Sequence, residues 1–313
     1  MSEREGRAAA ASAADAADAA DASAADAAGP PPTSQTQPIE VMLFDLDDTL
    51  MAHSQAVDSA IAAAQTAAGG AFADDDATDV QRRWRELEEW HYTRYLTGEL
   101  TYLGQRVWRA RDLLAPYGIV VDDEQALEWF ERYLVGYRDN WRLFDEVLPA
   151  LDALRGIEVH GQAFDGPEMQ GQGIDGLRFG IITNGDLAFQ TDKLHRIDLW
   201  NRLDLTPVRA DGSIDDPTRR GRLIASAELG ITKPDPGIFH AAAAAFGVAP
   251  AQCAYLGDRV RTDAIGAHDA GMLGIWLDRG RDRNPVTDHA EGSLPHGVPS
   301  IRSLHELPAL LTR

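Results

Sequence analysis

Near the start of the chain, the sequence changes sharply from a run of apolar residues to a run of polar residues. An apolar run, residues 41–44, is followed by three acids and a threonine: Asp45, Asp47, Asp48 and Thr49. A short apolar run that leads into polar residues predicts a buried strand ending at a loop. Three crowded acids repel one another unless a cation lies among them. The stretch therefore predicts a Mg²⁺ site with one carboxylate left for chemistry; the alternative is an acidic turn.

The same pattern recurs along the chain and predicts further strands and helices. The expected strands cover about 39–44, 178–183, 222–226, 253–258 and 274–277, with a short strand and helix within 298–311. The expected helices cover 144–154, 186–197, 236–246 and 264–270. Strands that alternate with helices predict an α/β fold: a Rossmann-like parallel sheet with right-handed crossovers and helices on both faces. Two stretches, 156–176 and 206–222, look irregular and predict surface insertions.

Helical spacing dominates between the first two strands. The expected helices are 54–68, 79–96, 100–117 and 123–141, and the aromatic residues among them are expected to form a core. About 90 residues of helix inserted directly after the acidic loop predict a small α-helical cap domain over the site. We expect residues 54–140 to form this cap and residues 38–53 and 141–313 to form the core domain. Residues 1–37, rich in alanine and aspartate, predict a disordered tail.

Composition narrows the possible partners and the compartment. The formal net charge of −21 argues against tight binding to nucleic acid or to an anionic membrane. No stretch is apolar enough over about 18 residues to span a bilayer. The single cysteine, Cys253, lies in an apolar run and predicts a buried structural thiol in a reducing compartment. We expect a cytoplasmic protein; the oligomeric state is left open.

Polar residues follow three of the predicted strands. They are Asp45, Asp47 and Thr49 after the first strand, Thr183 and Asn184 after the second, and Asp258 and Asp263 after the fourth, with Lys233 in a proline-containing loop between the last two groups. The carboxyl ends of parallel strands lie along one edge of a sheet, so these residues can converge. Each group alone has an ordinary explanation as a turn, a solvated loop or a helix cap. The ordered set is harder to explain in that way.

Four segments in this order resemble the motifs of the haloacid dehalogenase-like hydrolase superfamily. They are Asp45-Leu46-Asp47-Asp48-Thr49, Ile182-Thr183-Asn184, Lys233-Pro234-Asp235-Pro236 and Gly257-Asp258-Arg259-Val260-Arg261-Thr262-Asp263. The resemblance covers about 39–50 and 141–280, and the helical block resembles the cap of one subclass. It does not identify a subfamily.

The resemblance implies a role for each site residue. Asp45 would attack phosphorus and form an aspartyl-phosphate, and Asp47 would act as acid and then base. Mg²⁺ would be held by Asp45, Asp258, the backbone carbonyl of Asp47 and, directly or through water, Asp263. The Thr183 hydroxyl, the Asn184 N–H and Lys233 would hold the phosphoryl oxygens. Thr49 would brace the loop, whereas Asp48 would be solvated or cap a helix.

The resemblance leaves several functions to compare. Asp47 argues against a dehalogenase, and the loop sequence argues against an ion pump. The leading hypothesis is a phosphomonoester hydrolase acting on a small phosphorylated metabolite. A phosphomutase of the same superfamily and a non-catalytic binding or regulatory protein on this scaffold are the alternatives. Three cap arginines could contact the substrate, although surface or ion-pair roles are equally open to them: Arg94, Arg109 and Arg111.

Overall fold

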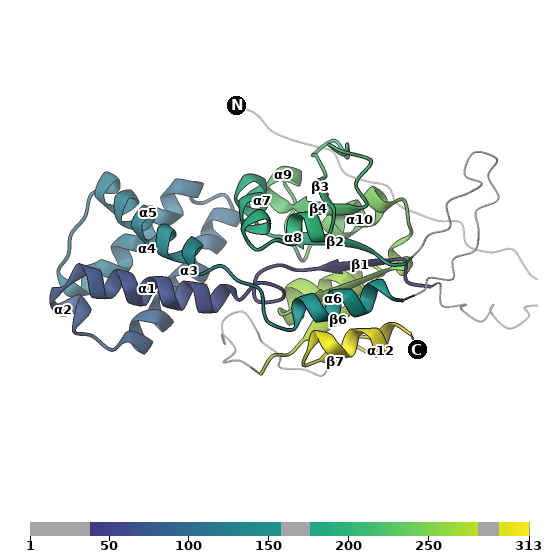
Figure 1. Ribbon diagram of the computed structural model, residues 1–313. Helices are drawn as coiled ribbons and strands as arrows, with labels where there is room; N and C mark the ends of the chain where they lie inside the picture. Colours follow the sequence, from purple (N-terminus) through teal and green to yellow (C-terminus); the bar gives the residue numbers. More distant parts are fainter. Residues whose placement is uncertain (1–37, 158–175, 281–293, 313) are drawn as a thin grey trace, which may run out of the picture. The chain divides into compact units, whose positions relative to one another are not determined.

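The computed structural model describes residues 38–157, 176–280 and 294–312. Its sheet has seven parallel strands in the order β3-β4-β2-β1-β5-β6-β7 (Figure 1). The strands are β1 (Val41–Phe44), β2 (Arg178–Thr183), β3 (Leu205–Pro207), β4 (Gly221–Ala225), β5 (Cys253–Gly257), β6 (Leu273–Leu277) and β7 (Ser300–Ile301). The predicted parallel sheet with helices on both faces and a helical cap is confirmed. The predicted tail, 1–37, and most of the predicted insertion at 156–176 lie outside the described residues.

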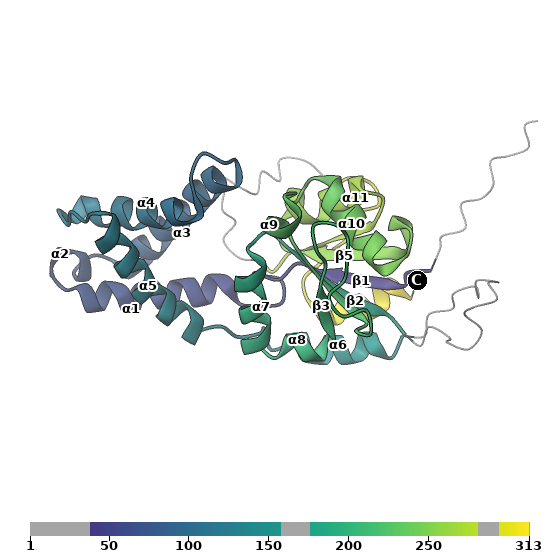
Figure 2. The ribbon, with the colours of Figure 1, turned by 90° about the horizontal axis from the view of Figure 1, so that it is seen from above.

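Strand β1 occupies the middle of the sheet because its four side chains are all apolar. It pairs with β2 on one side and with β5 on the other, and none of its residues is exposed. Alternate side chains point to opposite faces. Val41 and Leu43 pack with residues of α10 (Pro236–Phe246), whereas Met42 and Phe44 pack with residues of α6 (Val147–Arg155). Both faces of the sheet are therefore covered, as in Figure 2.

The remaining helices of the core connect or cover these strands. They are α7 (Leu187–Arg196), α8 (Leu199–Arg202), α9 (Ser226–Leu229), α11 (Gly266–Asp269) and α12 (Leu307–Leu311). A wide π-type turn, η3 (Val260–Ile265), follows β5 and leads into α11. Short 3₁₀ turns lie at η2 (Pro250–Gln252) and η4 (Leu304–Glu306).

One strand of the core was not predicted. The stretch 206–222 was expected to be irregular, and residues 208–220 contain no helix or strand, but β3 lies at its start. Strand β3 is only three residues long and contains a proline. Proline lacks the N–H that a central strand needs, so such a segment is tolerated at a sheet edge and gives little pattern in the sequence.

The inserted block consists of helices and one 3₁₀ turn. They are α1 (His53–Ala68), α2 (Gly70–Ala73), α3 (Ala77–Leu96), α4 (Tyr102–Leu114), η1 (Ala115–Tyr117) and α5 (Asp123–Asp139) (Figure 1). Asp76 caps α3 by accepting hydrogen bonds from the N–H groups of Thr78 and Asp79, which satisfies two donors of the first turn. Asp122 begins α5 with a capping box.

Aromatic side chains form much of the core of the cap. Trp84 is completely buried, and its ring centroid lies 5.5 Å from that of Trp129 and 4.8 Å from that of Tyr133. Trp90 and Trp108 are 61% and 42% exposed, so the expectation of a core role was wrong for these two tryptophans. No helix among the described residues has both the length and the apolar character needed to cross a bilayer.

Candidate active site

Asp45 is the first residue after β1 and lies at the carboxyl edge of the sheet. Its N–H donates a hydrogen bond to the carbonyl oxygen of Leu256 on β5 (2.8 Å). Its carboxylate accepts hydrogen bonds from Lys233 Nζ (2.7 Å) and from Thr49 Oγ1 (3.1 Å). Burial raises the pKa of Asp45 to about 6, against the attraction of Lys233. Asp45 is therefore harder to ionise than an ordinary aspartate, and additional positive charge nearby would favour its anionic form.

Lys233 joins two of the predicted acids. Its Nζ donates to Asp45 Oδ1 and to Asp263 Oδ1, both at 2.7 Å, and lies 2.8 Å from the Tyr255 hydroxyl. Burial alone would lower the pKa of Lys233, but Asp263 and Asp45 outweigh burial and raise it. The lysine is therefore a fixed positive charge at the sheet edge. Tyr255, on β5, was not predicted as part of the site.

The side chain of Asn184 holds the loop that carries Lys233. Its Oδ1 accepts from the Lys233 N–H (2.8 Å), and its Nδ2 donates to the Lys233 carbonyl (3.1 Å). The Asn184 carbonyl in turn accepts from the hydroxyl of Tyr92 on α3 (3.0 Å). Thr183 is the last residue of β2 and lines the same cavity as Asp45. The residues predicted to surround a phosphoryl group thus share one cavity wall.

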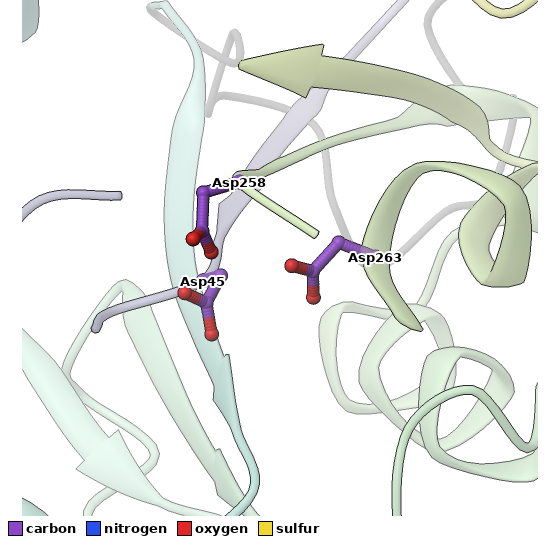
Figure 3. Close-up of side chains that lie close together, drawn as sticks. All are labelled: Asp45, Asp258 and Asp263. Carbon is purple, nitrogen blue, oxygen red and sulfur yellow. The ribbon is translucent and has the colours of Figure 1, made fainter. Parts of the chain in front are cut away.

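Two further carboxylates, those of Asp258 and Asp263, lie beside that of Asp45, as Figure 3 shows. One oxygen from each of Asp45, Asp258 and Asp263 lies within 4.8 Å of the other two. Burial raises the pKa of Asp258 well above its usual range, and repulsion from Asp45 and Asp263 adds to this shift. The Asp258 carboxylate accepts no hydrogen bond from the described residues. Clustered oxygen ligands with uncompensated negative charge suit a hard divalent cation such as Mg²⁺.

Asp263 is more constrained than Asp258. Its Oδ1 accepts from Lys233 and lies 3.0 Å from the Tyr255 hydroxyl, and its Oδ2 accepts from the Arg259 N–H (3.0 Å). Both oxygens are therefore already engaged by protein donors. Of the two predicted contributions of Asp263 to a metal site, contact through water fits this arrangement better than direct ligation.

Asp47, two residues after Asp45, has different neighbours. Lys193 Nζ lies 2.7 and 2.9 Å from the two oxygens of its carboxylate, and His53 Nδ1 lies 3.7 Å away. Burial is the largest single effect and raises the pKa of Asp47, but the charges of Lys193 and His53 and the hydrogen bonds from Lys193 together outweigh it, so that the pKa is lowered overall. Lys193 itself is 1% exposed and lies within 6 Å of three aromatic ring centroids: Tyr137, Trp141 and Phe189.

The other two residues of the acidic loop have structural roles. Thr49 Oγ1 donates to Asp45 and accepts from the Asp258 N–H (3.1 Å), so the predicted bracing role is confirmed. Asp48 accepts from the N–H of Ser54 in the first turn of α1 (2.9 Å) and also from the Ser54 hydroxyl. This is the helix-capping role that was expected of Asp48.

A cavity of about 940 Å³ connects these residues with the cap. Its wall includes Asp45, Asp47 and Lys233 on the core side and Glu88 and Arg109 on the cap side. Of the three cap arginines predicted to contact the substrate, Arg94 and Arg111 are not part of the wall. Arg94 pairs with Glu99 (2.6 Å) and Arg111 with Asp123 (2.6 Å), which makes them ion-pair residues.

Glu88 links the cap to the acidic loop. It lies 3.2 Å from Arg109 Nη2 and 3.7 Å from His53 Nε2. Burial would raise the pKa of Glu88, but Arg109 and His53 lower it to about 2. Burial likewise opposes protonation of His53, whereas Asp47 and Glu88 raise its pKa to about 9. Charges of both signs therefore alternate along this side of the cavity.

The sequence did not reveal several of these residues. Lys193, Glu88 and Tyr255 lie within predicted helices or strands, where nothing distinguishes them from solvated or core residues. His53 directly precedes the predicted helix 54–68 and is not marked by any motif. The only available signal was indirect: Lys193 comes ten residues after Thr183, on the helix that follows the second strand.

Comparison with known proteins agrees with this architecture. The model of the haloacid dehalogenase-like hydrolase family matches residues 39–271. The chain therefore belongs to this family of hydrolases.

Curated relatives and a solved structure are similar to parts or most of the chain. Phosphoserine phosphatase from Thermus thermophilus is 36% identical over 105 residues, which is 34% of this chain and only 35% of that protein. Glyceraldehyde 3-phosphate phosphatase from Methanopyrus kandleri is 28% identical over 256 residues, 80% of this chain and 89% of that protein. The magnesium-bound structure of the HAD-hydrolase YfnB from Bacillus subtilis covers 88% of this chain and all of its own, with a TM-score of 0.61 at 17% identity. At that identity the structure supports the fold alone.

Proposed function

We propose that the protein is a Mg²⁺-dependent phosphomonoester hydrolase acting on a small phosphorylated metabolite through an aspartyl-phosphate intermediate. The main support for this proposal is the environment of the Asp45 carboxylate. A single buried carboxylate contacts Lys233 on one side and lies beside Asp258 and Asp263 on the other. That arrangement places a nucleophile beside the fixed positive charge of Lys233 and beside carboxylates that suit a divalent cation, as phosphoryl transfer requires.

Asp45 acts as the nucleophile in this proposal. One carboxylate oxygen attacks phosphorus, the bond from phosphorus to the ester oxygen breaks, and the phosphoryl group is left on Asp45. Lys233, the Thr183 hydroxyl and the Asn184 N–H face the phosphoryl oxygens and stabilise their charge in the transition state. The hydrogen bonds from Asn184 to the backbone of Lys233 keep the lysine in place for this role.

Asp47 moves the protons. In its protonated form it donates a proton to the departing alcohol oxygen, and the carboxylate so formed then removes a proton from the water that attacks the aspartyl-phosphate, so that inorganic phosphate is released and Asp45 is regenerated. Its carboxylate lines the same cavity as Asp45. Lys193 holds both oxygens of this carboxylate and so fixes its direction.

The residues present fit a magnesium ion. Asp45, Asp258 and the backbone carbonyl of Asp47 would hold it, with Asp263 contributing through water. When bound, Mg²⁺ supplies positive charge that offsets the repulsion between a carboxylate nucleophile and a phosphate dianion.

The cavity and the relatives support a small substrate. Residues of the cap close one side of the cavity, which favours a molecule that fits within it rather than a polymer. The two curated relatives described above are named as phosphatases of phosphoserine and of glyceraldehyde 3-phosphate. Neither match identifies the substrate of this chain.

Hydrolysis of p-nitrophenyl phosphate, measured with and without Mg²⁺, tests the proposal. We expect turnover that depends on Mg²⁺ and that falls by at least about 10³-fold in Asp45→Asn, because the nucleophile is lost. Asp48→Asn is the matched control: it removes the same charge from the same loop, and turnover should persist because the Asp48 carboxylate is engaged by Ser54 at the start of α1 and has no role in the proposed reaction.

Other outcomes would point to other functions. No Mg²⁺-dependent turnover on a broad panel of phosphate monoesters would favour a binding or regulatory protein. Transfer of a labelled phosphoryl group to a second sugar hydroxyl instead of water would indicate a mutase. Release of halide from a haloacid would indicate a dehalogenase.

A further inference from the structure

Arg109, on α4 of the cap, is a buried cation with few partners. The residue is 4% exposed and lines the cavity that contains Asp45. Its contact with a charged residue is the ion pair with Glu88 Oε1, at 3.2 Å from Nη2. Nε and Nη2 of Arg109 are buried, yet neither makes a hydrogen bond to any described residue. A guanidinium carries five N–H donors, and leaving buried donors unsatisfied is costly.

Arg109 differs in this respect from the other cations around it. Each of the other lysines and arginines on the cavity wall donates at least one hydrogen bond to a described residue. For example, Lys233 donates a hydrogen bond to Asp45, and Lys193 donates one to Asp47. Within the described part of the cavity, Arg109 is therefore the cation whose hydrogen-bonding capacity is least used.

The surroundings of Arg109 keep the guanidinium at the cavity wall. Its Cζ lies 4.4 Å from the ring centroid of Trp84 and 5.1 Å from that of Phe130. Gln105 lies one helical turn earlier on α4, is 3% exposed, and has a buried Oε1 without a hydrogen-bond partner among the described residues. Two neighbouring polar side chains of one helix thus have buried atoms that make no hydrogen bond to a described residue, on the same wall.

We propose that Arg109 determines specificity by binding a carboxylate group carried on the leaving alcohol, so that the preferred substrates are phosphate monoesters of small hydroxy acids. The proposal rests on the proposed phosphatase function. A planar guanidinium matches a carboxylate in shape and donor spacing. Glu88 already offsets part of the charge of Arg109, which favours one added negative charge over the two of a second phosphate. Contact with the substrate needs a rotation of the guanidinium toward the cavity.

Matched pairs of substrates test this subsite. 3-Phosphoglycerate and glycerol 3-phosphate differ in one carboxylate, as do phosphoglycolate and ethyl phosphate. We expect the wild-type protein to prefer the carboxylate member of each pair by at least about tenfold in kcat/KM. Arg109→Gln should reduce that preference by about 10- to 100-fold, as expected for the loss of a hydrogen bond between charged groups. Arg109→Lys, which keeps the charge but not the planar donors, should lie between the two.

Arg106→Gln is the matched control. It removes the same charge from the same helix and the same cavity wall, but Arg106 is occupied by Glu131 (2.9 Å) and Tyr102 (2.6 Å). The preference for carboxylates should therefore persist in Arg106→Gln. Two results would overturn the subsite and leave the proposed function intact. In the first, the wild-type protein hydrolyses p-nitrophenyl phosphate but does not prefer the carboxylate member of either substrate pair. In the second, Arg109→Gln leaves the preference unchanged. A wild-type protein that hydrolyses no phosphate monoester with Mg²⁺ would overturn both.

Discussion

Asp45 and Asp47 are two residues apart, yet their neighbours move the two pKa values in opposite directions. Burial raises the pKa of Asp45 to about 6, and the nearby Asp263 adds to the shift. Burial acts on Asp47 in the same sense, but Lys193 and His53 together outweigh it. Asp45 therefore holds its proton to a higher pH than an ordinary aspartate, and bound Mg²⁺ would favour its anionic form. Asp47 is ionised at neutral pH in the free protein, which suits removal of a proton from water, and it must take up a proton before it can act as the acid.

Replacing Lys193 should change the pH dependence of turnover. Lys193→Met removes the charge that lowers the pKa of Asp47, so that pKa rises. A base must be ionised to act, and activity is lost as pH falls through its pKa. We therefore expect the acidic limb of the kcat profile to move to higher pH. We also expect kcat at neutral pH to fall by about tenfold or more, because the carboxylate is no longer held in place.

The control for this change is Lys193→Arg. It keeps a positive charge beside Asp47, so its acidic limb should stay nearer that of the wild-type protein. An acidic limb that does not move in Lys193→Met would show that the Lys193 contact does not control the ionisation of Asp47.

Cys253 provides an independent check at the scale of one residue. The thiol is fully buried on β5, and burial raises its pKa to about 12. Because the thiolate is the reactive form, a disulfide reagent at pH 8 should modify Cys253 very slowly in the native protein and rapidly in denaturant. Equal rates in both states would contradict the buried position and also the structural role predicted from the sequence.

At the scale of elements, the sequence predicted strands well wherever both faces of a strand are buried. Most of residues 41–44, 178–183 and 253–257 are apolar because these strands lie inside the sheet. Strand β3 was missed because an edge strand of three residues has no such run. Helix α10 was predicted with its observed ends, since Pro236 begins it and the left-handed Gly247 follows it.

The candidate site was predictable only where its residues follow strands. Asp45, Thr183 and Asp258 could be expected to meet because parallel strands end along one edge. Lys193 could not, since it becomes recognisable only when the packing of α7 buries it beside Asp47. The side-chain role of Asn184 was missed for a similar reason: its partner, the backbone of Lys233, is 49 residues away.

The end of β5 and the turn after it make close contact at Gly257. A Cβ atom on this residue would lie 2.3 Å from Asp263 Cγ, closer than atoms can approach. Gly257→Ala must therefore displace Asp263, and with it the contact that positions Lys233. We expect kcat to fall by about tenfold or more and the free energy of unfolding to fall by about 1–3 kcal/mol, as for other overpacked sites. Turnover assays and urea denaturation measure the two effects.

Gly136→Ala is the control for this steric argument. Gly136 lies inside α5, and an added Cβ would meet Ala60 at an ordinary distance of 3.6 Å. The free energy of unfolding should rise by about 0.5–1 kcal/mol, because alanine loses less backbone entropy in a helix than glycine does. Similar losses of activity in both alanine variants would contradict a specific effect at Gly257.

At the scale of the whole molecule, the formal net charge of −21 makes the buried acids costly. The pKa of Asp258 in the folded chain lies well above its usual value. The folded state therefore holds a proton that the unfolded state releases, and stability declines as pH rises above the pKa of the unfolded chain, near 4. At neutral pH without a divalent cation, Asp258 and Asp45 weaken the fold that contains them.

Mg²⁺ should reverse this destabilisation, and the Asp258→Asn variant distinguishes the Mg²⁺-free protein from the Mg²⁺-bound protein. In the presence of a chelator, the variant should melt at a higher temperature than the wild-type protein, because it lacks a buried charge. With Mg²⁺ at about 100 times its dissociation constant, binding stabilises the wild-type fold by about 2.7 kcal/mol, whereas the variant should gain little. The order of the two melting temperatures should then invert. Because any divalent salt screens a charge of −21, the titration is performed at constant ionic strength. Equal shifts in the two proteins would mean that Mg²⁺ acts on the surface and not at the Asp45–Asp258 site.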